Sequence, residues 1–287
     1  MLSFSYRNSI RILKYLPLCP WPEAVGLANI PKDGPLIYIY NHQTTRVEPL
    51  FLALAAPPDP PIRFFVDAKV ADPAILAETL KDVRNSVFSL SAQEKWARHS
   101  LTRKLMEKTS RMLTVFLTAN ITRYNFIPVF VHPPGSPEEE SIKRRINREA
   151  IESCLRSLEN DEPVAIAPRG GYTHQEATRS HVPTTLPSLA EMLQKQGKTL
   201  KIVPSVIQEK PQLGFATYKR YIADRILPYR VFRLLLQRLG IKRYERPRIT
   251  VQFLPPVTFP CIDSSKEEKV QFVLHLQKIM LDVLNRD

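Results

Sequence analysis

Two segments of the chain carry residue types that could do chemistry, and the first contains a histidine. His42 follows an apolar run at 36–40, and Glu48 lies six positions further on. Histidine is the common general base near neutral pH, and a nearby carboxylate can orient the imidazole and stabilise its charged form. The pair therefore predicts proton abstraction by His42. The alternative is that His42 only ends a strand, while Glu48 favours a helix start electrostatically.

The second segment places an arginine beside two glycines. Arg169, Gly170 and Gly171 come shortly after another apolar run, at 164–167. Because glycine has no side chain, the backbone here can approach a ligand closely. A guanidinium can bind two oxygens of a phosphate at once. The segment predicts a phosphate site, with an ordinary turn and a solvated arginine as the alternative.

Composition limits the classes to which the chain can belong. Its 287 residues carry a net charge of +13, which indicates an anionic partner: a phosphate ligand, an acidic carrier protein, an anionic membrane or a nucleic acid. A hydrophobic content of 44% excludes a disordered chain. Only 8 glycines, and no glycine-rich nucleotide motif, argue against a dinucleotide-binding fold. The three cysteines are far apart, so we expect neither a zinc site nor a disulfide framework.

Short apolar runs alternate with helical patterns along the chain. Strands are expected at 36–40, 63–66, 126–131, 164–167, 201–207 and 249–253, and Pro128 places the third at a sheet edge. Helices are expected near Pro49 and Pro73 and at 94–118, 141–158, 186–196 and 264–284. In the last helix Ser264 is the expected N-cap, with Glu267 completing a capping box.

This order predicts an α/β fold, with a mixed, mostly buried central sheet and helices on both faces. Residues 1–24 are expected to form an N-terminal amphipathic segment, and residues 25–287 a single α/β domain. The longest apolar run near the front, Leu50 to Ala56, is far shorter than the roughly 18 residues of a membrane span. Ligands of such sheets bind outside the carboxyl ends of the strands, so both candidate segments should face one crevice.

Several blocks resemble the glycerolipid acyltransferases, the family of glycerol-3-phosphate and lysophosphatidate acyltransferases. Residues 34–43 look like the family's opening block, an apolar strand followed by Asn-His-Gln. Residues 166–171 resemble its third block, especially in the soluble plastid-type glycerol-3-phosphate acyltransferase. Segments at 126–131, 202–207 and 249–257 are similar to the second block, the fourth block and a late strand of the family. All of them occur in family order.

The chain departs from the family pattern at two important positions. The family's aspartate would fall at Val47, whereas this chain has Glu48 one residue later. A one-residue bulge, together with the longer glutamate side chain, could still bring the carboxylate to His42. Arg169 stands where relatives have glutamate or serine. These departures leave open a catalytically impaired member of the family, or one with an altered substrate.

The resemblance implies an O-acyltransferase that needs no metal and no bound cofactor. Its co-substrate would be an acyl thioester of acyl carrier protein or coenzyme A. His42 would take the proton from a hydroxyl of glycerol 3-phosphate or a lysophospholipid, and Glu48 would orient the imidazole. The phosphate of the acceptor would be bound by basic and glycine residues, for which the candidates are Arg169, Gly170, Gly171, His174, His132, Lys143, Arg145 and Arg179.

A strongly basic stretch follows at residues 219–248, with ten basic and two acidic residues. Within it, residues 229–239 show an apolar side and a basic side. Such a helix suits an anionic membrane surface or an acidic carrier protein, although it could also pack on a core with its basic side solvated. No nucleic-acid-binding signature occurs, so no nucleic-acid partner is expected. We therefore expect a cytoplasmic protein that associates peripherally with membranes.

Overall fold

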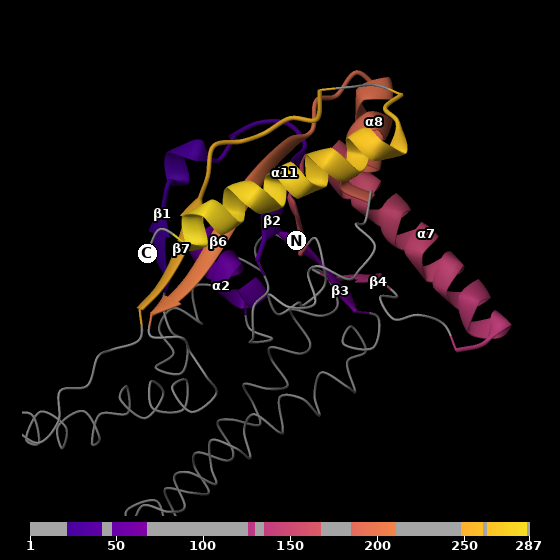
Figure 1. Cartoon of the computed structure of the whole chain (residues 1–287), viewed down its shortest axis with the longest axis horizontal. Helices are drawn as coiled ribbons and strands as arrows, with labels where there is room; N and C mark the ends of the chain where they lie inside the picture. The colour runs from indigo at the N-terminus through magenta and orange to yellow at the C-terminus, as the bar shows by residue number, and fades with distance from the viewer. Residues whose placement is uncertain are drawn as a thin grey trace, which may run out of the picture.

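A seven-stranded sheet forms the centre of the computed structural model, which describes residues 22–41, 48–67, 126–129, 135–167, 185–210, 248–260 and 263–285 (Figure 1). Its strands are β1 (Glu23–Val25), β2 (Leu36–Tyr40), β3 (Arg63–Asp67), β4 (Phe126–Val129), β5 (Val164–Ile166), β6 (Lys201–Lys210) and β7 (Arg248–Phe253). The order across the sheet is β1-β7-β6-β2-β5-β3-β4. The strands from β6 to β4 run parallel, while β7 pairs antiparallel with β6. The predicted mixed sheet is confirmed.

β2 lies in the middle of this sheet and is buried on both faces. Leu36, Tyr38 and Tyr40 belong to one core cluster, whereas Ile37 and Ile39 belong to another. A continuous apolar run is what a parallel strand covered on both faces requires. The strand predicted at 36–40 is therefore confirmed, together with the reason for its composition.

Helices cover both faces of the sheet, as predicted. The helix α2 (Glu48–Ala55) packs Phe51 and Leu52 into the first cluster. On the other face lie three longer helices, α7 (Pro137–Glu159), α8 (Thr185–Lys195) and α11 (Lys266–Leu284). A short 3-10 helix, η1 (Leu27–Asn29), follows β1. In the described ranges, no helix has both the length and the apolar character that a membrane crossing requires.

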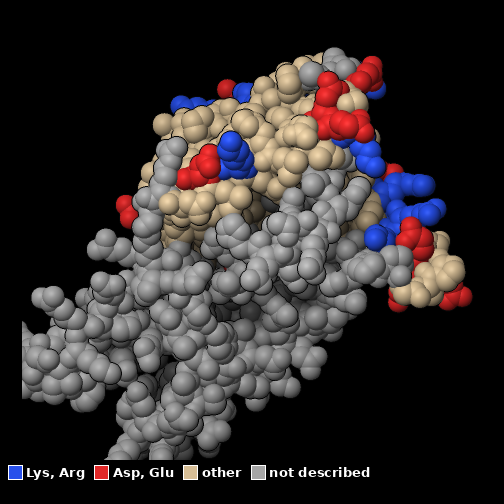
Figure 2. All heavy atoms as spheres, viewed as in Figure 1, with Lys and Arg blue, Asp and Glu red and all other residues tan. Residues whose placement is uncertain are grey.

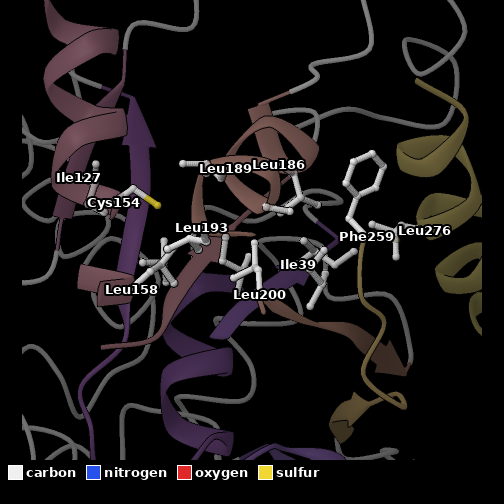
Figure 3. Close-up of a cluster of buried hydrophobic side chains, with 14 of the residues drawn as sticks. Ile39, Ile127, Cys154, Leu158, Leu186, Leu189, Leu193, Leu200, Phe259 and Leu276 are labelled. Atoms are coloured by element: carbon white, nitrogen blue, oxygen red, sulfur yellow. The ribbon is translucent and has the colours of Figure 1, made fainter. Parts of the chain in front are cut away.

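The second cluster joins these three helices to the sheet (Figure 3). Leu158 of α7, Leu189 and Leu193 of α8 and Ile39 of β2 are all fully enclosed within it. Each fully buried leucine or isoleucine contributes about 1.5–3 kcal/mol relative to an exposed one. Cys154 points into the same cluster, where burial raises the pKa of its thiol to about 12.

The capping box of α11 lies one residue later than predicted. The N-cap is Ser265, and its hydroxyl and backbone pair reciprocally with Glu268. Ser264 instead donates its backbone N–H to the Glu191 carboxylate of α8, which also pairs with Lys269 at 2.6 Å. That bond between two helices holds Ser264 outside α11. The predicted N-cap Ser264 and its partner Glu267 are therefore wrong.

Other element boundaries also differ from the expectation. α7 starts four residues early, because Ser136 caps the helix and Pro137 fits its first turn. β6 runs on to Lys210, since β7 pairs with it along 205–210. β1 was not predicted, and it crosses the boundary placed between residues 24 and 25. Residues 1–21, 68–125 and 211–247, which include the expected segments at 1–20, Pro73, 94–118 and 229–239, lie outside the described residues.

Candidate functional site

The candidate site lies where β2 and β5 end side by side. These two strands are parallel neighbours, and Ile39 of β2 pairs with Ile166 of β5. The residue after each of these, Tyr40 in β2 and Ala167 just after β5, therefore occupies a neighbouring position. Each precedes a predicted site residue by two positions: His42 in the first case and Arg169 in the second. The topology thus brings the two candidate segments to one edge of the sheet, although both side chains lie outside the described residues.

Glu48 is the predicted site residue that the structure describes most closely. It is the first residue of α2, and only 2% of its surface is exposed. The buried hydroxyl of Tyr40 feels its charge: burial raises the pKa of Tyr40 far above the ordinary value, and the Glu48 carboxylate raises it further. A buried carboxylate therefore lies near the end of β2, the strand that leads into His42.

Glu48 lies in the first turn of α2. The amino terminus of a helix carries a partial positive charge, which attracts an anion in the first turn. Helix α2 is fixed against the sheet by Phe51 and Leu52, both fully buried. The alternative role of Glu48, as a residue that only stabilises the helix start, uses the same attraction. A glutamate that only stabilises a helix start can be exposed to solvent. Glu48 is instead buried near the end of β2, which that alternative role does not require.

Asn41 follows the last residue of β2, and the sequence analysis gave it no role of its own. Its side-chain Nδ2 donates to the carbonyl oxygen of Ile207 at 2.8 Å, and its Oδ1 accepts from the Ile207 N–H at 2.6 Å. The ladder between β2 and β6 ends with Tyr40 and Ser205. The amide of Asn41 therefore takes the place of one more peptide group against β6. An asparagine directly after a buried parallel strand was the available signal.

Helix α7 carries two further candidates, which point in different directions. Its 23 residues span about 34 Å, and its amino-terminal half extends beyond β4 (Figure 1). Lys143 is half-buried and lies seven residues before the buried Ala150, which puts both on one stripe. Arg145 is exposed and lies nine residues before Cys154, about half a turn away from that stripe. Lys143 thus shares the sheet-facing stripe, whereas Arg145 faces away.

Three arginines are exposed near the middle of α7, where Figure 2 shows Lys and Arg side chains together with acidic ones. They are Arg144, Arg145 and Arg148, and Arg144 pairs with Glu140 at 3.0 Å. An exposed pair of this kind contributes little to stability. Most of the charge on this part of α7 is therefore open to solvent.

The remaining candidates lie outside the described residues: Gly170, Gly171, His174, His132 and Arg179, together with His42 and Arg169. The strands that precede these residues still indicate which of them lie nearer to the end of β2. β5 is next to β2, whereas β4, which leads to His132, is three strands away. At about 4.8 Å between strands, that is about 14 Å. The strand order therefore favours Arg169 over His132 as a neighbour of the β2 end.

Comparison with known proteins finds a likeness in structure and none in sequence. No family model matches the chain, and no curated protein matches it. Among solved structures, it is similar to the crystal structure of the 1-acyl-sn-glycerophosphate (LPA) acyltransferase PlsC from Thermotoga maritima. The identity is 16% and the TM-score is 0.36, over 98% of this chain and 79% of that chain. A likeness this distant carries no argument about activity.

Proposed function

We propose that this chain is an acyltransferase that moves a fatty acyl group from an acyl thioester to a hydroxyl of glycerol 3-phosphate or a lysophospholipid. One observation carries the proposal: Glu48 is buried in the first turn of α2, near Tyr40 at the end of β2. The next residue but one is His42. A general-base histidine needs such a carboxylate to hold its tautomer and stabilise its charge.

The alternation of side chains along β2 supports the same pairing. Leu36, Tyr38 and Tyr40 all pack in the cluster that α2 covers. Glu48 is the first residue of the helix that covers this face, so the described residues place a carboxylate on the same side of the sheet as Tyr40.

The proposed reaction transfers the acyl group directly from the sulfur of the thioester to the hydroxyl oxygen of the acceptor. His42 takes the proton of the acceptor hydroxyl while the oxygen attacks the thioester carbonyl carbon. The carbon–sulfur bond then breaks, and the leaving thiolate takes the proton from the imidazolium. Glu48 stabilises that imidazolium between the two proton transfers.

The acceptor's phosphate would bind beside the end of β2. Arg169 follows β5, the strand next to β2, and Lys143 lies on the sheet-facing stripe of α7. The donor would be a thioester of acyl carrier protein or coenzyme A, with no bound cofactor. We also propose a cytoplasmic protein that associates peripherally with anionic membranes, in keeping with its net charge of +13.

The proposal is tested by an acyl-transfer assay that crosses the two donors with the two acceptors. We expect His42→Ala to lower kcat by about 10²–10⁴, because the general base is removed. Glu48→Gln keeps the size of the side chain and removes its charge, so it should lower kcat by a smaller factor. Glu152→Gln, an exposed position on α7, serves as the matched control. Circular dichroism verifies the fold of each variant.

Two results would contradict the proposal. Turnover near the wild-type value in a folded His42→Ala variant would exclude His42 as the base. Absence of transfer from either donor to either acceptor would exclude the activity itself. Salt-sensitive binding to nucleic acid in that case would favour the alternative of a basic nucleic-acid-binding protein, one of the anionic partners that the net charge allows.

A further inference from the structure

The amino-terminal half of α7, residues 137–149, extends beyond β4 and takes no part in the second core cluster (Figure 1). We call it the projecting half. The residues of α7 that belong to that cluster or pack against it all come later in the helix: Ala150, Ile151, Cys154, Leu155 and Leu158. In the projecting half, by contrast, Ile142 leaves 43% of its surface exposed.

The projecting half is stabilised by contacts among its own residues. The hydroxyl of Ser136 accepts from the Glu139 N–H at 3.2 Å, and the Glu139 carboxylate accepts from the Gly135 N–H at 2.6 Å. One turn further on, Glu140 pairs with Arg144 at 3.0 Å. The cap and the ion pair support the helix locally, and they engage both of these acidic side chains.

Two charged residues of the projecting half remain available to a partner. Glu138 and Arg145 are both exposed, and neither forms an ion pair with any residue that the structure describes. At 100° per residue they lie within about 20° of each other around the helix, and Ile142 lies within about 40° of Glu138. These three residues form one exposed stripe, the α7 stripe, which has an acid at one end, a base at the other and an apolar side chain between them.

Such a stripe is complementary to itself when two copies run antiparallel. A two-fold axis between positions 141 and 142 places Glu138 of each copy opposite Arg145 of the partner subunit. The two Ile142 side chains then lie beside the axis. We propose that the α7 stripe is the contact surface for a second copy of this chain, in an antiparallel pair of α7 helices. The inference is independent of the proposed function.

The length of the projecting half sets the strength of this contact. Its 13 residues span only about 20 Å, so the pair buries less than the roughly 1,600 Å² of a standard protein interface. The association is therefore weak and reversible. The alternative is a solvated face, since a single exposed isoleucine is common on monomers and acidic residues are favoured at a helix start. That alternative predicts a monomer at every concentration.

Sedimentation velocity of the full-length chain, from about 1 to about 200 µM, tests the proposal. We expect the wild type to show a reversible monomer–dimer equilibrium that added salt weakens. Glu138→Arg and Arg145→Glu should each raise the dimer Kd at least about tenfold, because each change places two pairs of like charges across the axis. An equimolar mixture of these two variants should dimerise again, since every charge then faces its opposite. Ile142→Asp should also weaken the dimer.

A matched control lies on the same side of α7, outside the projecting half. Glu152→Arg reverses a charge at an exposed position, as Glu138→Arg does, and should leave the dimer Kd within about twofold of the wild-type value. Circular dichroism verifies the helix content of each variant. Recovery of the dimer on mixing excludes unfolding of α7 as the cause of the loss.

Three results would overturn the inference. The first is a wild-type chain that stays monomeric up to about 200 µM. The second is a dimer whose Kd changes neither with Glu138→Arg nor with Arg145→Glu, because the contact would then lie elsewhere. The third is failure of the mixed variants to dimerise, which would exclude the antiparallel arrangement. None of these results depends on acyl transfer, so the proposed function stands or falls separately.

Discussion

Lys143 and Arg145 are two residues apart on α7, yet helix geometry gives them different surroundings. Lys143 lies on the stripe of buried residues that faces the sheet, whereas Arg145 is exposed on the outward face. If the acceptor's phosphate binds near the end of β5, we expect Lys143 to lie closer to it than Arg145 does. The two residues are therefore a matched pair for testing the phosphate site.

We expect Lys143→Ala to raise the apparent KM for a phosphate-bearing acceptor by about tenfold, the loss of one hydrogen bond to a charged group. Arg145→Ala should leave that constant nearly unchanged, and neither variant should alter KM for the donor. Initial rates at varied acceptor concentration provide the measurement. Equal effects of the two variants would contradict a site on the sheet-facing stripe.

The residues of the site differ in how far the sequence could reveal them. Glu48 was predicted because a carboxylate six residues after a strand-end histidine is visible in the sequence, and the structure describes it as buried near that strand end. The hydrogen bonds of Asn41 were not predicted because its partner, Ile207, is 166 positions away in the chain. Side-chain bonds to a distant backbone depend on the strand order, which a single sequence does not state.

At the scale of elements, two glycines stand at helix ends with a left-handed backbone. Gly26 precedes η1 and Gly197 follows α8, each with φ of 75°. Their surroundings differ: a Cβ on Gly26 would meet the carbonyl oxygen of Phe253, whereas a Cβ on Gly197 would meet nothing within 4 Å. This pair separates the cost of the conformation from the cost of the contact.

We expect Gly197→Ala to lower the free energy of unfolding by about 1 kcal/mol, the cost of a left-handed backbone with a side chain. Gly26→Ala should lower it by roughly 2–4 kcal/mol, because β1 must also move away from β7. Urea denaturation followed by fluorescence gives both values. A cost for Gly26→Ala no greater than that for Gly197→Ala would mean that the β1–η1 corner yields easily.

Apolar runs predicted β2 and β6 well because both of these strands are covered on both faces. β1 escaped prediction because it has only three residues, two of them exposed. Pro204 lies within β6 although a proline is unfavourable in a central strand, so its surroundings must explain why it is tolerated there. The backbone of Pro204 faces Leu254, the residue just after β7. The N–H of Leu254 donates to the Pro204 carbonyl oxygen. The missing N–H therefore falls where the ladder is already irregular.

At the scale of the whole molecule, the net charge of +13 should govern association with surfaces. We expect reversible binding to vesicles that contain anionic lipid, weakened by added salt, since each Lys or Arg near such a surface contributes about 1 kcal/mol. Arg230→Glu combined with Arg233→Glu should weaken the binding further. Vesicle sedimentation at several salt concentrations measures it.

The control for that experiment is an equal change of charge elsewhere. Arg144→Glu combined with Arg148→Glu alters two exposed residues of α7 by the same amount. A loss of binding equal to that of the first pair would assign the effect to net charge alone. Binding to neutral vesicles as strong as to anionic ones, at any ionic strength, would contradict an electrostatic attachment.

The pairing of β1 with β7 limits when the sheet can form during synthesis of the chain. Ala24 of β1 pairs with Val251 of β7, so β1 cannot pair until the ribosome has synthesised β7. At about 5–20 residues per second, the ribosome needs roughly 10–45 s to add the intervening residues. β2 likewise waits for β5 and β6, and its apolar side chains remain without sheet partners during that time. The sheet is therefore completed only after β7 has been synthesised, and a nascent chain that stops before β7 cannot close it.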